Sequence, residues 1–413
     1  MVASGLANSV LGLVFWAVAA RLFSASEVGV AGALINTAVM LATLSNLSLG
    51  PLYERFLPQA GVRARGAILT GSALTITLAV AIGTGFVLLG PRDTLFASAT
   101  AAAAFPVCVA VLAAFSLADS ILIGLRVARW AAAKNIFHAV AKLVVLVVLG
   151  ATGSALSGSS EIIVSWIVPA AVAVVVVQAI IAIAGRALPP RSNPTLPPTR
   201  ELWTYFGSSL AITALSTVTP LALPLIVVVS AGTADTAYFT ITWTIVAAVL
   251  MAPGYIAGPF IAEAAACGER LAELLRRFLR LLLLVTVAST AAMALCGPVA
   301  LRLVGADYLA GGWQLLLLMS LVPIVGAPSI LYAVLCRVHR TMRIATILQV
   351  ASTIGIVAVS WALVPQVGVV GVGYTFVIVE TLISLACLVP LMRLLRTDLG
   401  ATPTTSTEVV GPS

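Results

Sequence analysis

Charged residues are scarce in this chain. Asp, Glu, Lys and Arg make up 9% of its 413 residues and there are two histidines, whereas 61% of the residues are hydrophobic. Soluble folds carry about 25% charged residues, so this composition excludes a soluble globular protein. The mean hydropathy of +1.15 is typical of a chain that lies mostly within a membrane.

Cysteine is also scarce and follows no metal-binding or redox spacing. The five cysteines are odd in number and form no CxxC pair: Cys108, Cys267, Cys296, Cys336 and Cys387. Most lie in or beside apolar runs, where a cysteine usually packs as a small apolar side chain. The sequence therefore predicts no zinc site, no disulfide framework, no metal and no other cofactor.

Several motifs that carry chemistry are missing as well. There is no Walker A segment, no Gly-rich loop that opens a helix, and no acidic or histidine cluster with metal-ligand spacing. The longest segment expected outside the cell, at about residues 297–311, is short. Membrane-embedded glycan polymerases and ligases need a larger loop that carries acidic or histidine residues. The sequence thus predicts a protein that moves a substrate and is not an enzyme.

Long apolar runs fill the chain. A membrane span needs about 20 apolar residues to cross a hydrocarbon core of about 30 Å. Runs of that length, rich in Ala, Leu and Val without strict alternation, indicate helices and not the strands of a barrel. We predict an all-α polytopic membrane protein with twelve spans at 3–20, 28–49, 66–90, 96–120, 134–153, 161–184, 204–230, 236–256, 278–297, 312–335, 343–364 and 370–391. The segment that begins at Met1 shows no basic region of a signal peptide, so we expect the first span to stay in the membrane.

The basic residues fall in every second gap between these spans. Of the 22 Lys and Arg, 18 lie in one set of gaps, whereas the alternate gaps hold only Arg21, Arg92 and Arg302, and Lys142 lies inside a span. Basic residues in short loops mark the cytoplasmic side, so we expect both termini in the cytoplasm. Charge scattered over separate loops argues against nucleic-acid binding. Trp16, Trp166 and four other tryptophans near span ends predict interfacial anchors.

The two halves of the chain resemble each other. Arg126-Val-Ala-Arg129 precedes span five, and Arg337-Val-His-Arg340 precedes span eleven, at a shift of 211 positions. Two weaker matches recur at similar shifts. Six spans per half give both halves the same orientation, so we predict two six-helix bundles related by a parallel pseudo-two-fold axis, with substrate bound between them. The bundles are expected at 1–184 and 204–391, joined by a Pro-rich cytoplasmic linker at 185–203 and followed by a disordered cytoplasmic tail at 392–413.

Two segments near the start resemble a known family. The segment Arg21-Leu22-Phe23-Ser24-Ala25-Ser26-Glu27-Val28-Gly29 and the segment Leu49-Gly50-Pro51-Leu52-Tyr53-Glu54-Arg55-Phe56-Leu57-Pro58 resemble the junctions after the first and second helices of Wzx-like flippases. These proteins belong to the multidrug/oligosaccharidyl-lipid/polysaccharide (MOP) exporter superfamily. The resemblance implies a MATE-like V of two bundles in the bacterial inner membrane. It also implies alternating access that flips polyprenyl-pyrophosphate-linked oligosaccharides for surface polysaccharides such as lipopolysaccharide, with membrane lipids and other polysaccharide-assembly proteins as partners.

Polar residues inside the spans are candidates for the substrate site. A charge near the centre of a bilayer costs about 2.5–3.5 kcal/mol on insertion scales, so it usually faces a cavity or a partner. Asn135, His138 and Lys142 share one face of span five by their spacing. The resemblance adds Arg21 and Arg55 as donors to an anionic pyrophosphate. The full set expected to bind substrate is Arg21, Arg55, His138, Lys142, Asn36, Thr213 and Ser216.

Each of these residues also has a structural interpretation. Lys142 could form a tertiary pair, most simply with Asp119, and His138 could be a packing histidine. Arg55 fits the positive-inside pattern, and the hydroxyl and amide residues commonly join membrane helices. Glu380 in span twelve and Asp119 are the candidates for coupling to a cation or proton, with a helix-locking carboxyl as the alternative for Glu380. The arginines at 270–280 predict an amphipathic helix on the inner membrane surface.

Three other functions compete with flipping. A cation-coupled multidrug antiporter of the MATE type would share the fold, but the candidate site residues are basic, which favours an anionic head group. A glycan polymerase or ligase would need a large loop outside the membrane, which this sequence lacks. A scaffold without transport does not explain charges inside the spans.

Overall fold

The computed structural model describes residues 2–47, 49–152, 156–187, 219, 222–266, 271–339 and 341–400. All of the secondary structure in these ranges is helical, as predicted. Ten of the described helices are long and apolar enough to cross a membrane, and each matches a predicted span. The first predicted span, 3–20, is found as the helix Val2–Leu22. The seventh predicted span lies mostly outside the described residues, which show its last part, 222–230, as helix.

The first half of the chain forms one bundle. Its long helices are α2 (Ala25–Ser45), α4 (Ala64–Leu89), α6 (Ala99–Gly124), α7 (Ala128–Thr152) and α8 (Gly158–Ala187), with the short α3 (Leu49–Phe56) and α5 (Arg92–Leu95) at their ends. Ser24 starts α2 through a capping box in which its side chain accepts from the Glu27 amide and the Glu27 carboxylate accepts from the Ser24 amide. α7 begins six residues earlier than predicted, so Lys134, expected to be the first residue of span five, lies six residues inside the helix.

The second half forms the other bundle. It contains α10 (Thr233–Leu250), α11 (Ala252–Ala266), α12 (Leu271–Ala291), α13 (Gly297–Val304), α14 (Ala306–Val338), α15 (Met342–Val367) and α16 (Val370–Gly400). A π-helical turn at Ala292–Cys296 joins α12 to α13. The prediction of a surface helix at 270–280 was wrong: Arg276, Arg277 and Arg280 lie on α12, which continues as a helix of membrane-spanning length, and Arg270 lies outside the described residues.

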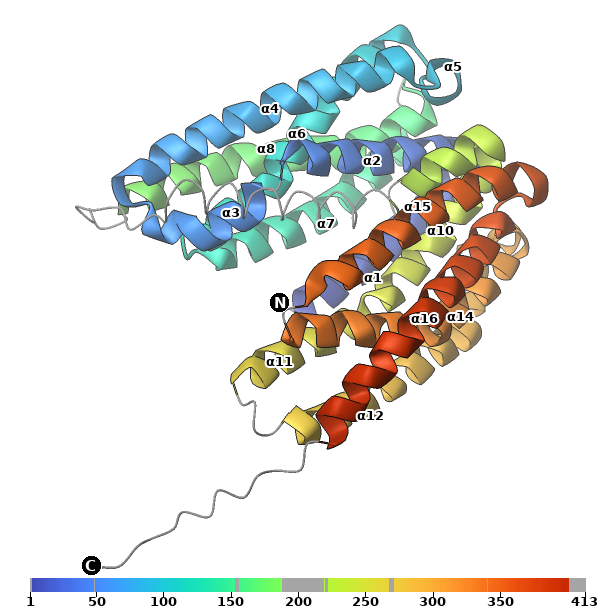
Figure 1. Ribbon diagram of the computed structural model, residues 1–413. Coiled ribbons are helices and arrows are strands. Elements are labelled where there is room, and N and C mark those ends of the chain that lie inside the picture. The colour runs from blue at the N-terminus through green and yellow to red at the C-terminus, as the bar shows by residue number, and fades with distance from the viewer. Residues whose placement is uncertain are drawn as a thin grey trace, which may run out of the picture.

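The two bundles meet at one end and diverge toward the other. In Figure 1 they approach each other near α5 and separate toward α3 and α11, so that the molecule has the shape of a V. α2 packs along α10, and α1 (Val2–Leu22) contacts both α7 and α10. This arrangement agrees with the predicted pair of bundles. The pseudo-two-fold relation between them stays a prediction.

Glycines permit the close contact between α2 and α10. A Cβ atom at Gly29 would overlap the carbonyl group of Thr233, and one at Gly32 would lie 2.7 Å from the Thr240 hydroxyl. Beside them the hydroxyls of Ser26 and Thr233 are 2.8 Å apart. The contact lies at the first turns of both helices, which is the end that the basic residues predict to face outward.

Candidate functional site

A cavity of about 270 Å³ lies inside the first bundle. It is lined by α2, α6, α7 and α8, and its wall combines apolar side chains with a few polar groups. The lining residues are Val39, Ala42, Thr43, Leu112, Phe115, Ser116, Asn135, His138, Ala139, Lys142 and Trp166. The structure thus brings together Asn135, His138 and Lys142, the three residues that sequence spacing placed on one face of span five. We call this space the Lys142 cavity.

Lys142 is buried without an opposite charge. Its exposed fraction is 7%. Its Nζ lies 3.9 Å from the centre of the Trp166 ring and 5.1 Å from that of Phe15. Within the described part of the chain, no carboxylate pairs with this ammonium. Cation–π contacts contribute about 2 kcal/mol when desolvated, so they offset part of the cost of the buried charge and leave it available to an anion.

His138 connects α7 and α8, two of the helices that line the cavity. Its Nε2 lies 3.0 Å from the carbonyl oxygen of Trp166 on α8. Its ring packs against Phe115 at 4.9 Å and meets Trp166 edge-on at 5.7 Å. A histidine with these contacts joins α7 to α8. Its placement favours the structural interpretation over direct binding of a substrate.

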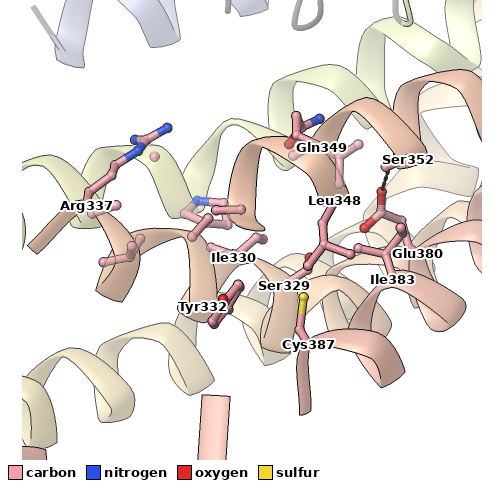
Figure 2. A pocket seen from close by; sticks show the side chains of 17 residues that line it. Ser329, Ile330, Tyr332, Arg337, Leu348, Gln349, Ser352, Glu380, Ile383 and Cys387 are labelled. Atoms are coloured by element: carbon pink, nitrogen blue, oxygen red, sulfur yellow. Dashed lines mark hydrogen bonds between the residues drawn. The ribbon is translucent and has the colours of Figure 1, made fainter. Parts of the chain in front are cut away.

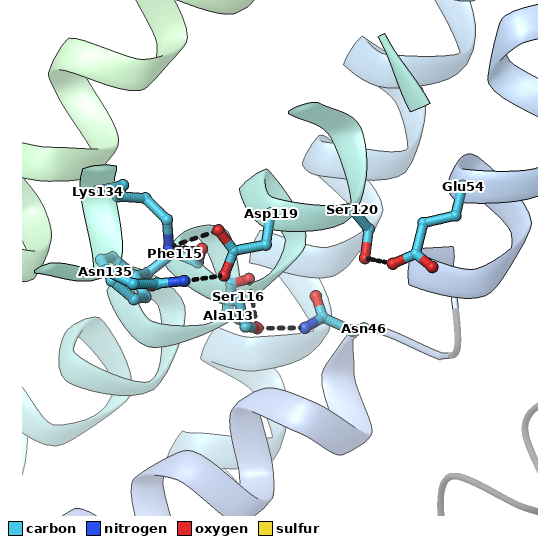
Figure 3. Close-up of polar contacts among 9 residues, drawn as sticks. All are labelled: Asn46, Glu54, Ala113, Phe115, Ser116, Asp119, Ser120, Lys134 and Asn135. Atoms are coloured by element: carbon cyan, nitrogen blue, oxygen red, sulfur yellow. Dashed lines mark hydrogen bonds and ion pairs between the residues drawn. The ribbon is translucent and has the colours of Figure 1, made fainter. Parts of the chain in front are cut away.

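Asp119 pairs with Lys134 and not with Lys142. Lys134 Nζ is 3.2 Å from Asp119 Oδ1 and donates to the Phe115 carbonyl at 2.8 Å. Asn135 donates to the other carboxylate oxygen at 3.1 Å. Figure 3 shows these side chains converging between α6 and α7. The structural alternative for Lys142, a pair with Asp119, is therefore not found, because Lys134, two turns earlier on α7, takes that place.

Further hydrogen bonds connect α2 and α3 to α6 beside this pair. Asn46, at the end of α2, donates to Ser116 Oγ at 2.6 Å, and Ser120 donates to Glu54 of α3 at 2.7 Å (Figure 3). Four segments are thus joined at the end of the bundle where the basic residues lie. Asp119 has a structural role here, which leaves its candidacy for coupling without support from the geometry.

The two arginines lie at opposite ends of the first half. Arg55 is exposed on α3, with its guanidinium 5.2 Å from the centre of the Phe56 ring. Arg21 is exposed at the end of α1 and donates to the carbonyl oxygen of Leu303 in the second half at 2.7 Å. Arg21 therefore joins the two halves where they meet. Asn36 is partly buried on α2, where its amide donates to the Gly32 carbonyl of the same helix at 2.7 Å. Thr213 and Ser216 lie outside the described residues.

Glu380 lines a cavity in the second bundle that also measures about 270 Å³. Ser352 donates to its Oε1 at 2.9 Å. In Figure 2 Glu380 and Ser352 lie side by side, joined by this bond, with Gln349 on the same helix as Ser352 and Arg337 on α14 at the other side of the view. We call this space the Glu380 cavity. Among the described residues, the two cavities share no lining residue.

Sequence reasoning missed the aromatic wall around Lys142. Trp16 and Trp166 were expected to anchor span ends at the membrane surface, which was wrong. Trp16 is 5% exposed and packs edge-on against Phe15 at 5.3 Å, and Trp166 contacts Lys142 and His138. Position in the span gave no signal of this, because Trp16 lies only four residues before the predicted end of the first span.

Comparison with known proteins identifies the fold. No protein-family model matches the sequence, and no curated protein matches it. A solved structure described as the inward-facing conformation of a multidrug resistance MATE family transporter of the MOP superfamily matches with a TM-score of 0.67 and 14% identity, over 95% of this chain and 99% of that one. An outward-facing MATE transporter matches with a TM-score of 0.56 and 16% identity, over 97% and 94%.

A third solved structure is the lipid II flippase MurJ in an inward closed conformation. It matches with a TM-score of 0.61 and 12% identity, over 96% of this chain and 89% of that one. Identities this low establish fold and not substrate. The chain is a multi-pass membrane protein with the fold of the MOP-superfamily transporters.

Proposed function

We propose that this protein is a flippase that moves a polyprenyl-pyrophosphate-linked oligosaccharide across the bacterial inner membrane by alternating access. The observation that carries the proposal is Lys142: an ammonium buried in a cavity of the first bundle, held by aromatic rings and not neutralised by any described carboxylate. The diphosphate of such a lipid would supply the negative charge that pairs with this ammonium. The resemblance of the first 60 residues to Wzx-like flippases and the fold shared with MurJ support the same substrate class.

The three candidate cations lie at three levels of the first half. Arg55 is at the diverging end, Lys142 is in the middle of α7, and Arg21 is where the bundles meet. Single cations at separate levels attract an anion at each step without trapping it in one tight cluster. The lipid tail would remain in the bilayer while the head group moves past these residues.

The contact between the halves supplies a gate. Arg21 with Leu303, Ser26 with Thr233, and Gly29 against α10 close the end that is predicted to face outward, whereas the cytoplasmic end is the divergent one. The higher TM-score to the inward-facing than to the outward-facing MATE structure fits this arrangement. Transport would require this contact to open as the other end closes.

The orientation is tested by labelling cysteines from outside intact cells. In a variant without native cysteines, we expect Ser98→Cys, which is exposed before α6, to react with a membrane-impermeant maleimide. Ser192→Cys in the Pro-rich linker should react only after the cells are opened, because positive loops stay inside. The reverse pattern would overturn the orientation and with it the assignment of the outer gate.

The gate is tested by a disulfide across it. The hydroxyl oxygens of Ser26 and Thr233 are 2.8 Å apart, so we expect Ser26→Cys with Thr233→Cys to cross-link on mild oxidation. Transport should then fall nearly to zero and return with a reductant, whereas Ser26→Cys alone should be unaffected by either treatment. Undiminished transport by fully cross-linked protein would show that this contact does not open.

The substrate class is tested with purified protein in liposomes. We expect a fluorescent polyprenyl-pyrophosphate sugar placed in one leaflet to become accessible to a quencher on the other side only when the protein is present. The same lipid with a neutral head group should move much more slowly. Equal rates for both lipids would contradict a site built around a cation.

One observation favours a second candidate function. Glu380 is a carboxylate inside a span, as a proton- or cation-coupled multidrug antiporter of the MATE type would need. Such a protein would export cationic dyes in exchange for protons or sodium ions that move down an imposed gradient. Dye export by wild type that is lost in Glu380→Gln, with no flipping of the anionic lipid, would favour the antiporter.

A further inference from the structure

The Glu380 cavity occupies a place in the second bundle that corresponds to the Lys142 cavity in the first. The Lys142 cavity is lined by helices that match predicted spans two, four, five and six. The Glu380 cavity is lined by α10, α14, α15 and α16, which match predicted spans eight, ten, eleven and twelve, together with α11. Under the predicted repeat these are the same four helices. The two halves thus carry equivalent cavities of about 270 Å³ each.

The polar groups of the two cavities differ in sign. The first holds Lys142 among aromatic rings, and the second holds Glu380 with hydroxyl, amide and guanidinium groups. Within the part of the chain that the structure describes, Glu380 has no ion-pair partner. Its Oε1 accepts from Ser352, its Oε2 lies beside Gly326, and the Ser329 hydroxyl is a second neighbour of the carboxylate. The side chain of Glu380 is only partly buried, so the carboxylate can reach a group inside the cavity that it lines.

The lining of the Glu380 cavity is suited to hydroxyl groups. A carboxylate accepts two or more O–H donors, the Gln349 amide both donates and accepts, and the Arg337 guanidinium donates. Gln349 and Arg337 are exposed and line the cavity, and Figure 2 shows Arg337 at the opposite side of the view from Glu380. Sugar hydroxyls donate and accept at once, so each of these groups has a partner on a sugar ring. The volume is near the lower end of ligand pockets, about 300 Å³, which fits a small polar group.

Taken with the proposed function, on which this inference rests, the geometry points to a divided head-group site. We propose that the Glu380 cavity binds hydroxyl groups of a sugar in the lipid-linked glycan, while Lys142 attracts the pyrophosphate. The second bundle then distinguishes a glycosylated lipid from the bare carrier lipid that returns after the glycan is used. A sugar fits this lining better than a metal ion, which would need further oxygen ligands around Glu380. It also fits better than a proton alone, which would leave the Gln349 amide and the Arg337 guanidinium without a role.

The test compares two probes on the purified full-length protein: undecaprenyl pyrophosphate, and the same lipid carrying one N-acetylglucosamine. We expect wild type to bind the glycosylated lipid roughly tenfold more tightly, the size expected of one or two hydrogen bonds to charged or amide groups. Glu380→Ala and Gln349→Leu should lose this preference and bind the bare lipid as wild type does. The matched control is Gln366→Leu, which should keep the preference for the glycosylated lipid. Gln366 is an exposed glutamine on α15, the helix that carries Gln349, and its amide donates to the Ala362 carbonyl.

The outcomes separate this inference from the proposed function. Lys142→Ala should weaken the binding of both lipids alike and leave their ratio unchanged. Equal wild-type affinity for the two lipids would overturn the sugar site while leaving the flippase proposal standing. A preserved ratio in Glu380→Ala, with transport that no longer responds to a proton or sodium gradient, would overturn it in favour of coupling. If wild type binds neither lipid, both proposals fail together. Glu380→Gln, which keeps the shape of the side chain, guards against a loss of fold and should retain part of the preference.

Discussion

Replacing Lys142 with Met should abolish flipping without harming the fold. The ammonium is 7% exposed and interacts with the rings of Trp166 and Phe15. Removing one partner of a buried charge pair costs about 2–5 kcal/mol, so we expect flipping of the pyrophosphate lipid to fall roughly hundredfold or more. The measurement is the initial flipping rate in liposomes at equal protein content.

Lys142→Met should not lower the stability of the protein, although it removes transport. An unpaired charge inside a span costs about 2.5–3.5 kcal/mol, and cation–π contacts offset only part of this. A methionine of similar length avoids that cost, so the thermal unfolding temperature of Lys142→Met should stay equal to that of wild type or rise. A residue kept for packing would show the reverse, with lower stability and little change in rate. The pair of measurements therefore distinguishes a binding residue from a structural one.

Two variants serve as controls for Lys142. Phe137→Ala removes a side chain of the same helix that is 47% exposed and does not line the Lys142 cavity, so it should leave flipping within about twofold of wild type. Trp166→Phe keeps an aromatic face beside the ammonium and should lose only part of the activity. Full activity in Lys142→Met would remove the observation on which the flippase proposal depends.

Much of the fold follows from patterns that the sequence displays directly. Ten predicted spans are found as helices because a membrane requires long apolar runs whose backbone bonds are satisfied within the helix. The boundaries were less accurate where polar residues lie inside a helix. The fifth span was predicted to begin only at Lys134, after the charged residues Arg126 and Arg129, but α7 begins at Ala128, and Lys134 is buried in it beside the carboxylate of Asp119.

The site could be predicted only in part for a related reason. Helical spacing placed Asn135, His138 and Lys142 on one face, since this depends on local geometry alone. Which partner each one meets depends on the rotation and depth of three other helices, which no local pattern gives. Phe15 and Trp166 come from helices far apart in the sequence, and their meeting around Lys142 required the structure.

Breaking the Lys134–Asp119 pair should be the most destabilising polar change in the first bundle. Lys134 is 1% exposed at its side chain and Asp119 is 28% exposed, with 3.2 Å between nitrogen and oxygen. Removing one partner of a buried pair costs about 3–5 kcal/mol because the other charge is left uncompensated. Since Asp119 retains some exposure, we expect Lys134→Met and Asp119→Asn each to cost about 3 kcal/mol of unfolding free energy.

The double variant tests whether the pair or its separate members matter. With both charges removed, no uncompensated charge remains, and replacing a buried pair by neutral groups is often close to neutral. We therefore expect Lys134→Met with Asp119→Asn to recover most of the loss, giving a coupling energy of about 2 kcal/mol or more in a double-mutant cycle. Glu54→Gln is the matched control, because this carboxylate is exposed and bonds only to the Ser120 hydroxyl among the contacts described, so its loss should cost less than about 1 kcal/mol. Additive losses in the double variant would mean that Lys134 and Asp119 act through other partners. In that case Asp119 would regain its place as a candidate for coupling, because its carboxylate would be free to take up a proton during transport.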